Sequence, residues 1–215
     1  MSEIDRKIKV IRAPKRGHYD KETIYRILDQ DFLCHVGFVH EGSPVVIPTL
    51  YGRDSNSLYI HGSMASRMMK NLEKGCEVCI TITQVDGLVL ARSAFHHSMN
   101  YQSVVVFGIA ELVTGKEKMT ALEVISDQII ADRWEEVRKP NEKEMKATMV
   151  LKISLDQASA KIRTGGPVDE EADHSLDVWA GHVPVKRQYL APMTDKLIDD
   201  GRKVSPSVQK LLREK

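Results

Sequence analysis

The chain of 215 residues has few cysteines, few aromatic residues and no excess of charge of either sign. Its three cysteines, Cys34, Cys76 and Cys79, are too few for a disulfide framework, and its first 22 residues hold no apolar stretch of signal-peptide length. We therefore expect a reducing, cytoplasmic setting with free thiols. Since no apolar run approaches the roughly 18 residues that a membrane-spanning helix needs, we expect no membrane contact.

The charges of the chain nearly cancel. Lys and Arg number 31 against 30 Asp and Glu, so no global field favours nucleic acid or anionic lipid, and neither is expected as a partner. Hydrophobic residues make up 42% and charged residues 28%, which is typical of soluble globular proteins. An anionic ligand must therefore be recognised by a local group of residues.

Several motifs that carry common chemistries are missing. The chain has no Walker loop, GxGxxG turn, nucleophile elbow or HExxH pair, which argues against the common nucleotide-binding folds and against triad hydrolases. Cys76 and Cys79 have the CxxC spacing, but no second pair completes a zinc site, so both are interpreted as buried structural thiols. Adjacent residues of a strand point to opposite faces, so the pair His96 and His97 is a weak metal signal. No metal site is predicted.

Short apolar and β-branched runs separated by turn residues predict a β-rich fold with flanking helices, a small barrel. Strands are expected over 32–40, 43–53, 57–61, 77–85, 87–93, 103–114 and 149–156, with a tight hairpin at Asp86-Gly87. Helices are expected over 21–30, about 64–75 and 116–136. The predicted organisation is an N-terminal arm (1–20), one domain (21–189) and a C-terminal tail (190–215).

A first candidate site lies in the segment YIHGSMASRMMK, residues 59–70, where a strand leads into a helix. A helix start offers free N–H groups, and Arg67 with Lys70 adds positive charge, so the segment can seat a phosphate. The alternative is an ordinary capped helix whose cations are solvated.

A second candidate site lies between residues 90 and 113. His96, His97, Ser98, Asn100, Tyr101, Gln102 and Ser103 crowd into eight positions, which suits a planar, hydrogen-bonding ligand. The alternative is a polar hairpin loop. Further along, Trp179 can either cover a ring system or pack in the core.

These segments resemble the pyridoxamine 5′-phosphate oxidase-related flavin-binding proteins, in the branch of the nitroimidazole reductase-like proteins. The matching stretches are IPTLYGRDSNSLYIHGSMASR, DGLVLARSAFHHSMNYQSVVVFG, KISLD and VWAGHVPV, within residues 32–185. The resemblance implies a split β-barrel homodimer that holds two FMN molecules between its subunits. Arg67 is followed by Met68 where the oxidase has Lys, and the C-terminal motif for pyridoxal phosphate has no match, so vitamin B6 oxidase activity is not expected.

The resemblance also implies roles for individual residues. Pro48, Thr49 and Leu50 would lie along the isoalloxazine ring, and Ile60 and His61 beside the ring and the ribityl chain. Ser66, Arg67 and Lys70 would hold the phosphate. The remaining cofactor-binding residues would be Tyr101, Gln102, Ser103 and, closing over the site, Trp179.

These features predict an FMN-dependent oxidoreductase that acts on a small planar substrate. The flavin would carry out the redox chemistry itself. His61 is the candidate catalytic proton donor because an imidazole titrates near neutral pH. Its alternative role is a hydrogen bond to the flavin. The rival function is a carrier or sensor that binds flavin without turnover, and heme or a deazaflavin in the same barrel follows from fold analogy alone.

Overall fold

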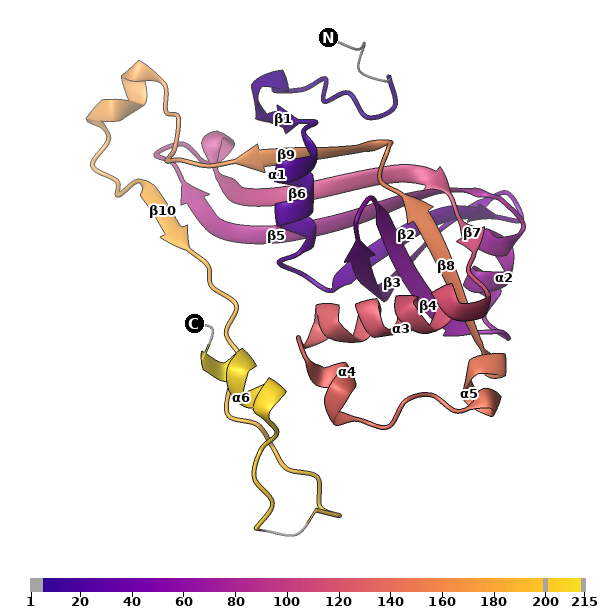
Figure 1. Ribbon diagram of the computed structural model, residues 1–215. Helices are drawn as coiled ribbons and strands as arrows, with labels where there is room; N and C mark the ends of the chain where they lie inside the picture. The colour runs from indigo at the N-terminus through magenta and orange to yellow at the C-terminus, as the bar shows by residue number, and fades with distance from the viewer. Residues whose placement is uncertain (1–5, 199–200, 214–215) are drawn as a thin grey trace.

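The computed structural model describes residues 6–198 and 201–213, so the outermost residues of the predicted arm and tail lie outside the described parts. Ten strands form one antiparallel sheet in the order β1-β9-β6-β5-β2-β3-β4-β8-β7, with β10 paired to β5 (Figure 1). The β-rich fold class with flanking helices is therefore confirmed. The sheet has two ends, β1 and β7, and does not close on itself.

The elements follow the chain in this order. The strands are β1 Gly17–His18, β2 Leu33–His40, β3 Ser43–Asp54, β4 Ser57–Ser63, β5 Glu77–Leu90, β6 Ser98–Ile109, β7 Glu111–Leu112, β8 Thr148–Ser154, β9 Ala158–Arg163 and β10 Gly181–Pro184. The helices are α1 Lys21–Leu28, α2 Arg67–Glu73, α3 Gly115–Ile129, α4 Arg133–Glu136, α5 Glu142–Ala147 and α6 Pro206–Arg213, with short 3-10 turns η1 Pro14–Arg16, η2 Ala94–His96 and η3 Glu171–Ser175.

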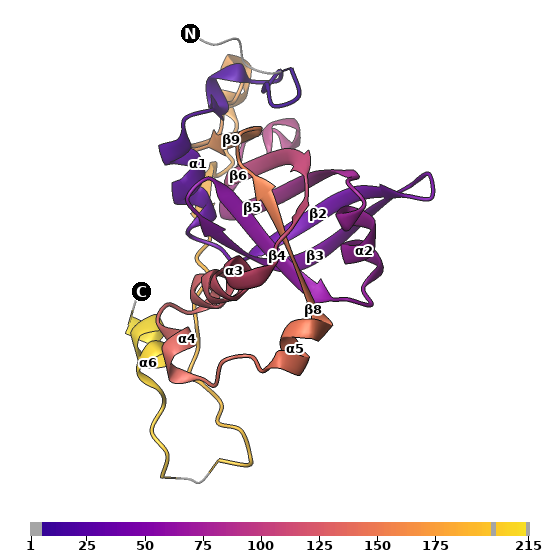
Figure 2. The same ribbon diagram turned by 45° about the vertical axis from the view of Figure 1, so that its right-hand side comes forward.

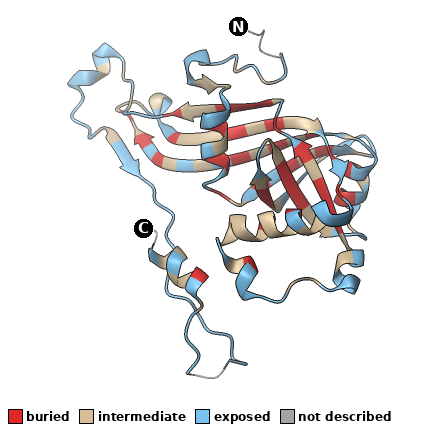
Figure 3. Ribbon diagram, viewed as in Figure 1, coloured by how far each residue is buried: buried red, intermediate tan, exposed pale blue. Residues whose placement is uncertain are grey.

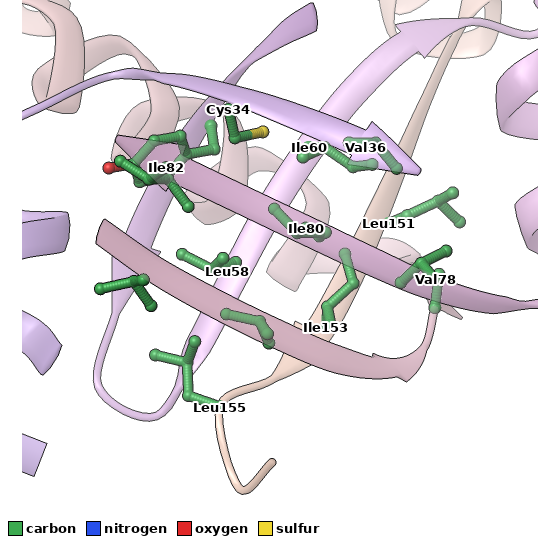
Figure 4. Close-up of a cluster of buried hydrophobic side chains, with 14 of the residues drawn as sticks. Cys34, Val36, Leu58, Ile60, Val78, Ile80, Ile82, Leu151, Ile153 and Leu155 are labelled. Carbon is green, nitrogen blue, oxygen red and sulfur yellow. The ribbon is translucent and has the colours of Figure 1, made fainter. Parts of the chain in front are cut away.

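The core lies between the two halves of the sheet. Ile80, Ile82 and Val36 come from one half and meet Leu58 and Ile153 of the other, and all five are fully buried (Figures 3 and 4). Strands β2 and β5 alternate buried and more exposed residues along most of their length, as expected when one face covers a core. We call the opposite face of the strands, which is turned away from this core, the outer face. On β2, β5 and β6 it is left available for other contacts.

Helix α3 packs on the sheet at an unusually close approach. A Cβ atom on Gly52 of β3 would lie 2.7 Å from the backbone N and Cα of Ile125 in α3. From the same helix, Gln128 donates hydrogen bonds to the carbonyls of Leu28 (3.0 Å) and Asp31 (2.6 Å). The glycine and the glutamine therefore fix α3 against β3 and the end of α1.

The predicted hairpin at Asp86-Gly87 is wrong. Residues 77–90 form one strand, β5, which pairs with β6 along its length and accommodates the extra residue as a bulge between Val85 and Gly87. The glycine serves another purpose, because a Cβ on Gly87 would lie 2.8 Å from the carbonyl oxygen of Val183 in β10. Gly87 therefore allows β10 to approach rather than the chain to turn.

Other predicted elements differ in their limits. The helix predicted over 116–136 is interrupted, because α3 ends at Ile129 and Asp132 takes a left-handed conformation (φ 67°) before α4. The strand predicted over 103–114 begins five residues earlier, at Ser98, and breaks before β7. The remaining predicted strands and the first two helices are confirmed within a few residues, whereas β1, β9, α5 and α6 were not predicted.

The cysteines are free, and only one is fully buried. Cys34 has no exposed surface, and burial raises the pKa of its thiol to about 12. Cys76 and Cys79 are partly exposed, so the prediction that both are buried is wrong. Among the described residues no helix is long and apolar enough to cross a membrane.

Candidate functional site

Strand β3 passes from one half of the sheet to the other directly after Pro48, Thr49 and Leu50, the residues predicted to lie along the flavin ring. Residues up to Leu50 pair with β2, and from Tyr51 onward the strand pairs with β4. Before Tyr51 the edge of β3 that faces β4 pairs with no other described strand. Pro44 and Pro48 stand on this stretch, where a missing N–H costs least at an unpaired edge. Backbone groups near Leu50 are thus available to a ligand.

Strand alternation divides the predicted site residues between two faces. Pro48 and Leu50 lie on the outer face of β3, and Leu50 packs beside Ile125 of α3. Thr49 lies opposite the buried Cys34 on the core side. Ile60 is also fully buried in the core, so its side chain is turned away from the outer face. Of the predicted β3 residues, Pro48 and Leu50 are therefore those whose side chains a ligand on this face can contact.

His61 stands on the outer face next to Leu50. It follows Ile60, which pairs with Tyr51, and it alternates with Ile60 so that its ring points the other way. Its Nδ1 atom is buried and has no hydrogen-bond partner among the described residues. Burial also lowers the pKa of His61 below its usual value of 6.5. A buried, neutral imidazole nitrogen without a partner is therefore ready to bond to a ligand.

Acidification is expected to destabilise the protein through His61. Its native pKa lies below 6.5, so between these two values the unfolded chain binds a proton that native His61 does not. The free energy of unfolding should then fall as the pH drops below about 6.5 and be insensitive to this group above it. Urea unfolding of the parent and of His61→Gln over this pH range should show a smaller slope for the variant. Equal slopes would contradict the assignment.

The predicted phosphate residues lie at the start of α2, directly after β4. The Ser66 hydroxyl accepts a hydrogen bond from the Met69 amide at 3.4 Å and so caps the helix. Arg67 and Lys70 are exposed and three residues apart, which places them on one side of α2. Neither forms an ion pair with another described residue. The pair can therefore receive an anion, mainly through its side chains because α2 is short.

The second predicted segment also divides between two faces. Tyr101 and Ser103 of β6 are half-buried and alternate with Gln102. The Gln102 amide oxygen instead accepts a hydrogen bond from Arg26 of α1 at 2.8 Å. Tyr101 and Ser103 therefore share the outer face with Pro48, whereas Gln102 is engaged by the helix on the other face.

Within a single chain, the predicted site residues of β3 and those of β6 lie apart. Ser103 pairs with Thr83, while Pro48 pairs with His35, which in turn pairs with Thr81. Three strand spacings and two residues separate Pro48 from Ser103, which amounts to roughly 16 Å. The outer face thus carries two groups of predicted site residues.

Trp179 lies still farther away. It is 64% exposed and stands against Gly181 at the start of β10. Gly181 pairs with Leu90, at the opposite end of β5 from α2 (Figure 1). The β5 strand of 14 residues is about 45 Å long. Trp179 is therefore not packed in the core. It is also too far from Arg67 and Lys70 of the same chain to contact them.

The structure adds residues that the sequence did not indicate. A hollow of about 310 Å³ lies where β5 runs between β2 and β10, and Thr83, Val85 and Arg187 line it. Arg187 bridges to Asp31 at 3.1 Å and lies over the Phe32 ring. Val85 pairs with Tyr101, which joins the hollow to the outer face. No sequence signal indicated it, because β10 and the segment after it have no regular pattern.

Comparison with known families supports the resemblance seen in the sequence. The family model described as pyridoxamine 5′-phosphate oxidase matches residues 20–162, which includes β2 through β8 and most of β9. A search of curated proteins finds no match.

Comparison with solved structures finds two that match nearly the whole chain. The flavocytochrome Anf3 of Azotobacter vinelandii is 37% identical, with a TM-score of 0.89 and 96% of each chain covered. An FAD and heme binding protein of Mycobacterium smegmatis is 34% identical, with a TM-score of 0.89, and the match covers 91% of this chain and 97% of that one.

A third structure matches less of the chain. It comes from Bacteroides thetaiotaomicron, and its name assigns it provisionally to 5-nitroimidazole antibiotic resistance. It is 27% identical with a TM-score of 0.58, and the match covers 68% of this chain and 86% of that one. The match supports the nitroimidazole-related branch that the sequence motifs indicated.

Proposed function

The chain belongs to the pyridoxamine 5′-phosphate oxidase family, and from that premise we propose that it is a flavin-dependent oxidoreductase acting on a small planar substrate. The observation that carries the proposal is the family match over residues 20–162, joined by 37% identity to a flavocytochrome over nearly the whole chain. When bound, the flavin would supply hydride or electron exchange with the substrate.

The described residues fit a flavin phosphate and ring. Arg67 and Lys70 offer two cations without an ion-pair partner in the described chain, and Ser66 stands beside them. His61 offers a buried nitrogen that lacks a hydrogen bond, and the unpaired edge of β3 offers backbone groups beside Pro48 and Leu50. A ligand that spans these groups would satisfy the polar atoms that the chain alone leaves unsatisfied.

We further propose that a homodimer completes the site. Pro48 and Ser103 lie roughly 16 Å apart on one outer face, and Trp179 lies beyond both at the far end of β5. A second copy of the chain that packs on this face can bring its Tyr101, Ser103 and Trp179 close to Arg67 and Lys70 of the first copy. Light scattering should then give twice the mass of one chain, and a monomer at micromolar concentration would contradict the shared site.

His61 is proposed as the group that holds or donates a proton at the flavin. Its lowered pKa keeps the imidazole neutral near pH 7, so Nδ1 or Nε2 can accept a proton or donate one according to the tautomer. The alternative role is a fixed hydrogen bond to the cofactor. A His61→Asn variant that binds flavin normally but loses turnover would favour the proton role, and unchanged turnover would exclude it.

The first experiment is an absorbance spectrum of the purified protein followed by chromatography of the flavin that heat releases. Flavin bands would support the proposal, and the chromatogram would distinguish the predicted FMN from FAD, which the Mycobacterium smegmatis protein is named for. A colourless protein that binds neither FMN nor FAD would contradict the proposal. Flavin that no electron donor reduces would favour the carrier.

Heme is a second candidate cofactor, favoured by the names of both whole-chain matches. The described residues hold no cluster of three or more His, Cys, Asp or Glu suited to a bare metal ion. A heme needs only one or two axial ligands, for which imidazole is common. His96 and His97 stand beside Phe95, which is 87% exposed, and offer imidazoles next to an apolar ring.

A Soret band and a pyridine hemochrome would establish bound heme. Single alanine variants at His35, His61, His96, His97 and His182 should then identify an axial ligand by a changed iron spectrum. Retention of the parent spectrum in all five would exclude these histidines, and the lack of a Soret band after reconstitution with hemin would exclude heme.

A further inference from the structure

The first described segment of the chain is strongly basic. Residues 6–19 contain six Lys and Arg and no acidic residue, although the whole chain has 31 basic and 30 acidic residues. Two cations of β9, Lys161 and Arg163, lie beside this segment because β1 pairs with β9. We call the group of Lys9, Arg12, Lys15, Arg16 and Lys161, with Arg163 beneath it, the basic surface.

The basic surface has a defined structure. Gly17 pairs with Lys161 and His18 with Ala160, so the arm is joined to the sheet. The Val10 amide donates a hydrogen bond to the Tyr19 hydroxyl at 2.8 Å, which closes the arm on itself. Figures 1 and 2 both place the arm beside β9. The positive charges are therefore held in place on the body of the protein.

The positive charge of this surface is not neutralised by the described chain. None of its six cations forms an ion pair with a described residue, whereas the neighbouring Lys7 pairs with Glu77. Arg163 is 6% exposed and bonds only to the neutral oxygens of Asn100, Gly165 and Gly166. Burial lowers its pKa, as does, to a lesser extent, the charge of Arg16. An acidic partner can supply the missing charge.

The basic arm also carries an exposed apolar residue. Ile11 is 80% exposed and lies between Lys9 and Arg12 in the chain. Protein interfaces commonly combine apolar contacts with charged residues around them. Single-stranded nucleic acid is usually bound with aromatic stacking, yet the one Phe, Tyr or Trp in 6–19, Tyr19, bonds to Val10. A membrane-surface helix is also absent, since the described arm has only the three-residue turn η1.

The basic surface is close to one part of the candidate site. Lys161 pairs with Ser103, and Arg163 pairs with Tyr101. Gly17 of the arm is thus two strand spacings from Ser103, which is roughly 10 Å. A protein that docks on the arm would come near a ligand that contacts Tyr101 and Ser103.

We propose that the basic surface docks an acidic electron-carrier protein that delivers electrons to the flavin. The proposal rests on the proposed function, because a flavin oxidoreductase needs an electron donor. The carrier passes on one electron at a time, so two reduced carriers are oxidised in successive encounters as the flavin takes its pair of electrons, and the protons come from water. Complexes of redox proteins are small and transient, and charge complementarity raises their association rates.

The test is stopped-flow reduction of the flavin-loaded protein by a reduced plant-type ferredoxin, an acidic carrier. The rate should fall steeply as salt rises from about 20 to about 500 mM. Reversing the charges of Lys9, Arg12, Lys15 and Arg16 to Glu should lower the low-salt rate by about 10- to 1,000-fold and abolish the salt dependence. The matched control, with Glu at the exposed Lys74, Lys116, Lys143 and Lys146, has the same net charge and should stay within about threefold of the parent.

Two outcomes of the kinetic test would overturn the proposal. One is a parent-like rate in the arm variant, and the other is an equal loss in the control variant, which would reflect net charge alone. Reduction by dithionite, which needs no docking, should be the same in all three proteins. Calorimetry of ferredoxin with flavin-free protein tests docking even if the flavin assignment fails, so the two proposals can fail separately.

Ile11 separates a protein partner from a simple polyanion. Ile11→Ser should weaken ferredoxin binding by about tenfold without changing its salt dependence, because an apolar anchor is lost and no charge is. Binding of duplex DNA or of phosphatidylserine vesicles serves as the comparison. Tighter binding of the parent to either of these than to ferredoxin, at the same salt, would overturn the proposal.

Discussion

Replacing Arg67 by alanine is expected to weaken flavin binding by about 10- to 150-fold. A hydrogen bond to a charged group contributes about 1.5–3 kcal/mol, and Arg67 is exposed at the start of α2 without an ion-pair partner in the described chain. Removing a solvated cation costs the fold little, so the loss should appear in binding rather than in stability. Fluorescence titration of the flavin-free protein with FMN and with FAD measures it.

Two variants make the Arg67 result specific. Lys74→Ala removes a positive charge from the other end of the same helix and should leave the Kd within about twofold. Arg67→Lys retains the charge but loses the bidentate geometry, so it should fall between the parent and Arg67→Ala. An unchanged Kd in Arg67→Ala, or an equal loss in Lys74→Ala, would remove Arg67 from the phosphate site.

Gly52→Ala is expected to lower the free energy of unfolding by about 3 kcal/mol or more. The added Cβ would lie 2.7 Å from the Ile125 N and Cα and 2.8 Å from the Val124 carbonyl carbon. These are backbone atoms of α3, so no side-chain rotation relieves the overlap, and the helix must move away from the sheet. Urea unfolding gives the free energy, and the midpoint of thermal unfolding should fall by roughly 6–12 °C.

The matched control for Gly52 is Gly166→Ala. No atom lies within 4 Å of a Cβ at Gly166, and its substitution should change stability by less than about 0.5 kcal/mol. A Gly52→Ala protein as stable as the parent would show that α3 does not approach β3 so closely. Because α3 packs on Leu50, next to His61, the same variant should also weaken flavin binding.

The short apolar and β-branched runs between turn residues were enough to predict most strands, because these runs supply the core. Side-chain alternation along a strand separates Thr49 from Pro48 and Gln102 from Ser103, since neighbouring residues of a strand point to opposite faces. The motif resemblance grouped these residues without regard to face. In the structure, Thr49 lies opposite the buried Cys34 and Gln102 bonds to Arg26, so both side chains lie on the other face from Pro48 and Ser103.

Asp86-Gly87 shows how tertiary contacts override a local signal. The dipeptide favours a tight turn, but β6 pairs with residues on both sides of it and β10 packs over Gly87. Neither contact can be read locally, because β10 follows β5 by some ninety residues and has no strand pattern of its own. The pairing of β10 with β5 also places Trp179 near Leu90, at the end of β5 that lies away from α2.

The sequence by itself determined the β-rich class, the family and the types of residue that can meet a flavin phosphate, because periodicity and motifs are local properties. Only the tertiary structure decided which face each residue occupies, that the Nδ1 atom of His61 is buried without a hydrogen-bond partner among the described residues, and that Pro48 and Ser103 stand far apart. These features depend on strand register and on the packing of α3. Both are set by contacts between residues distant in the chain.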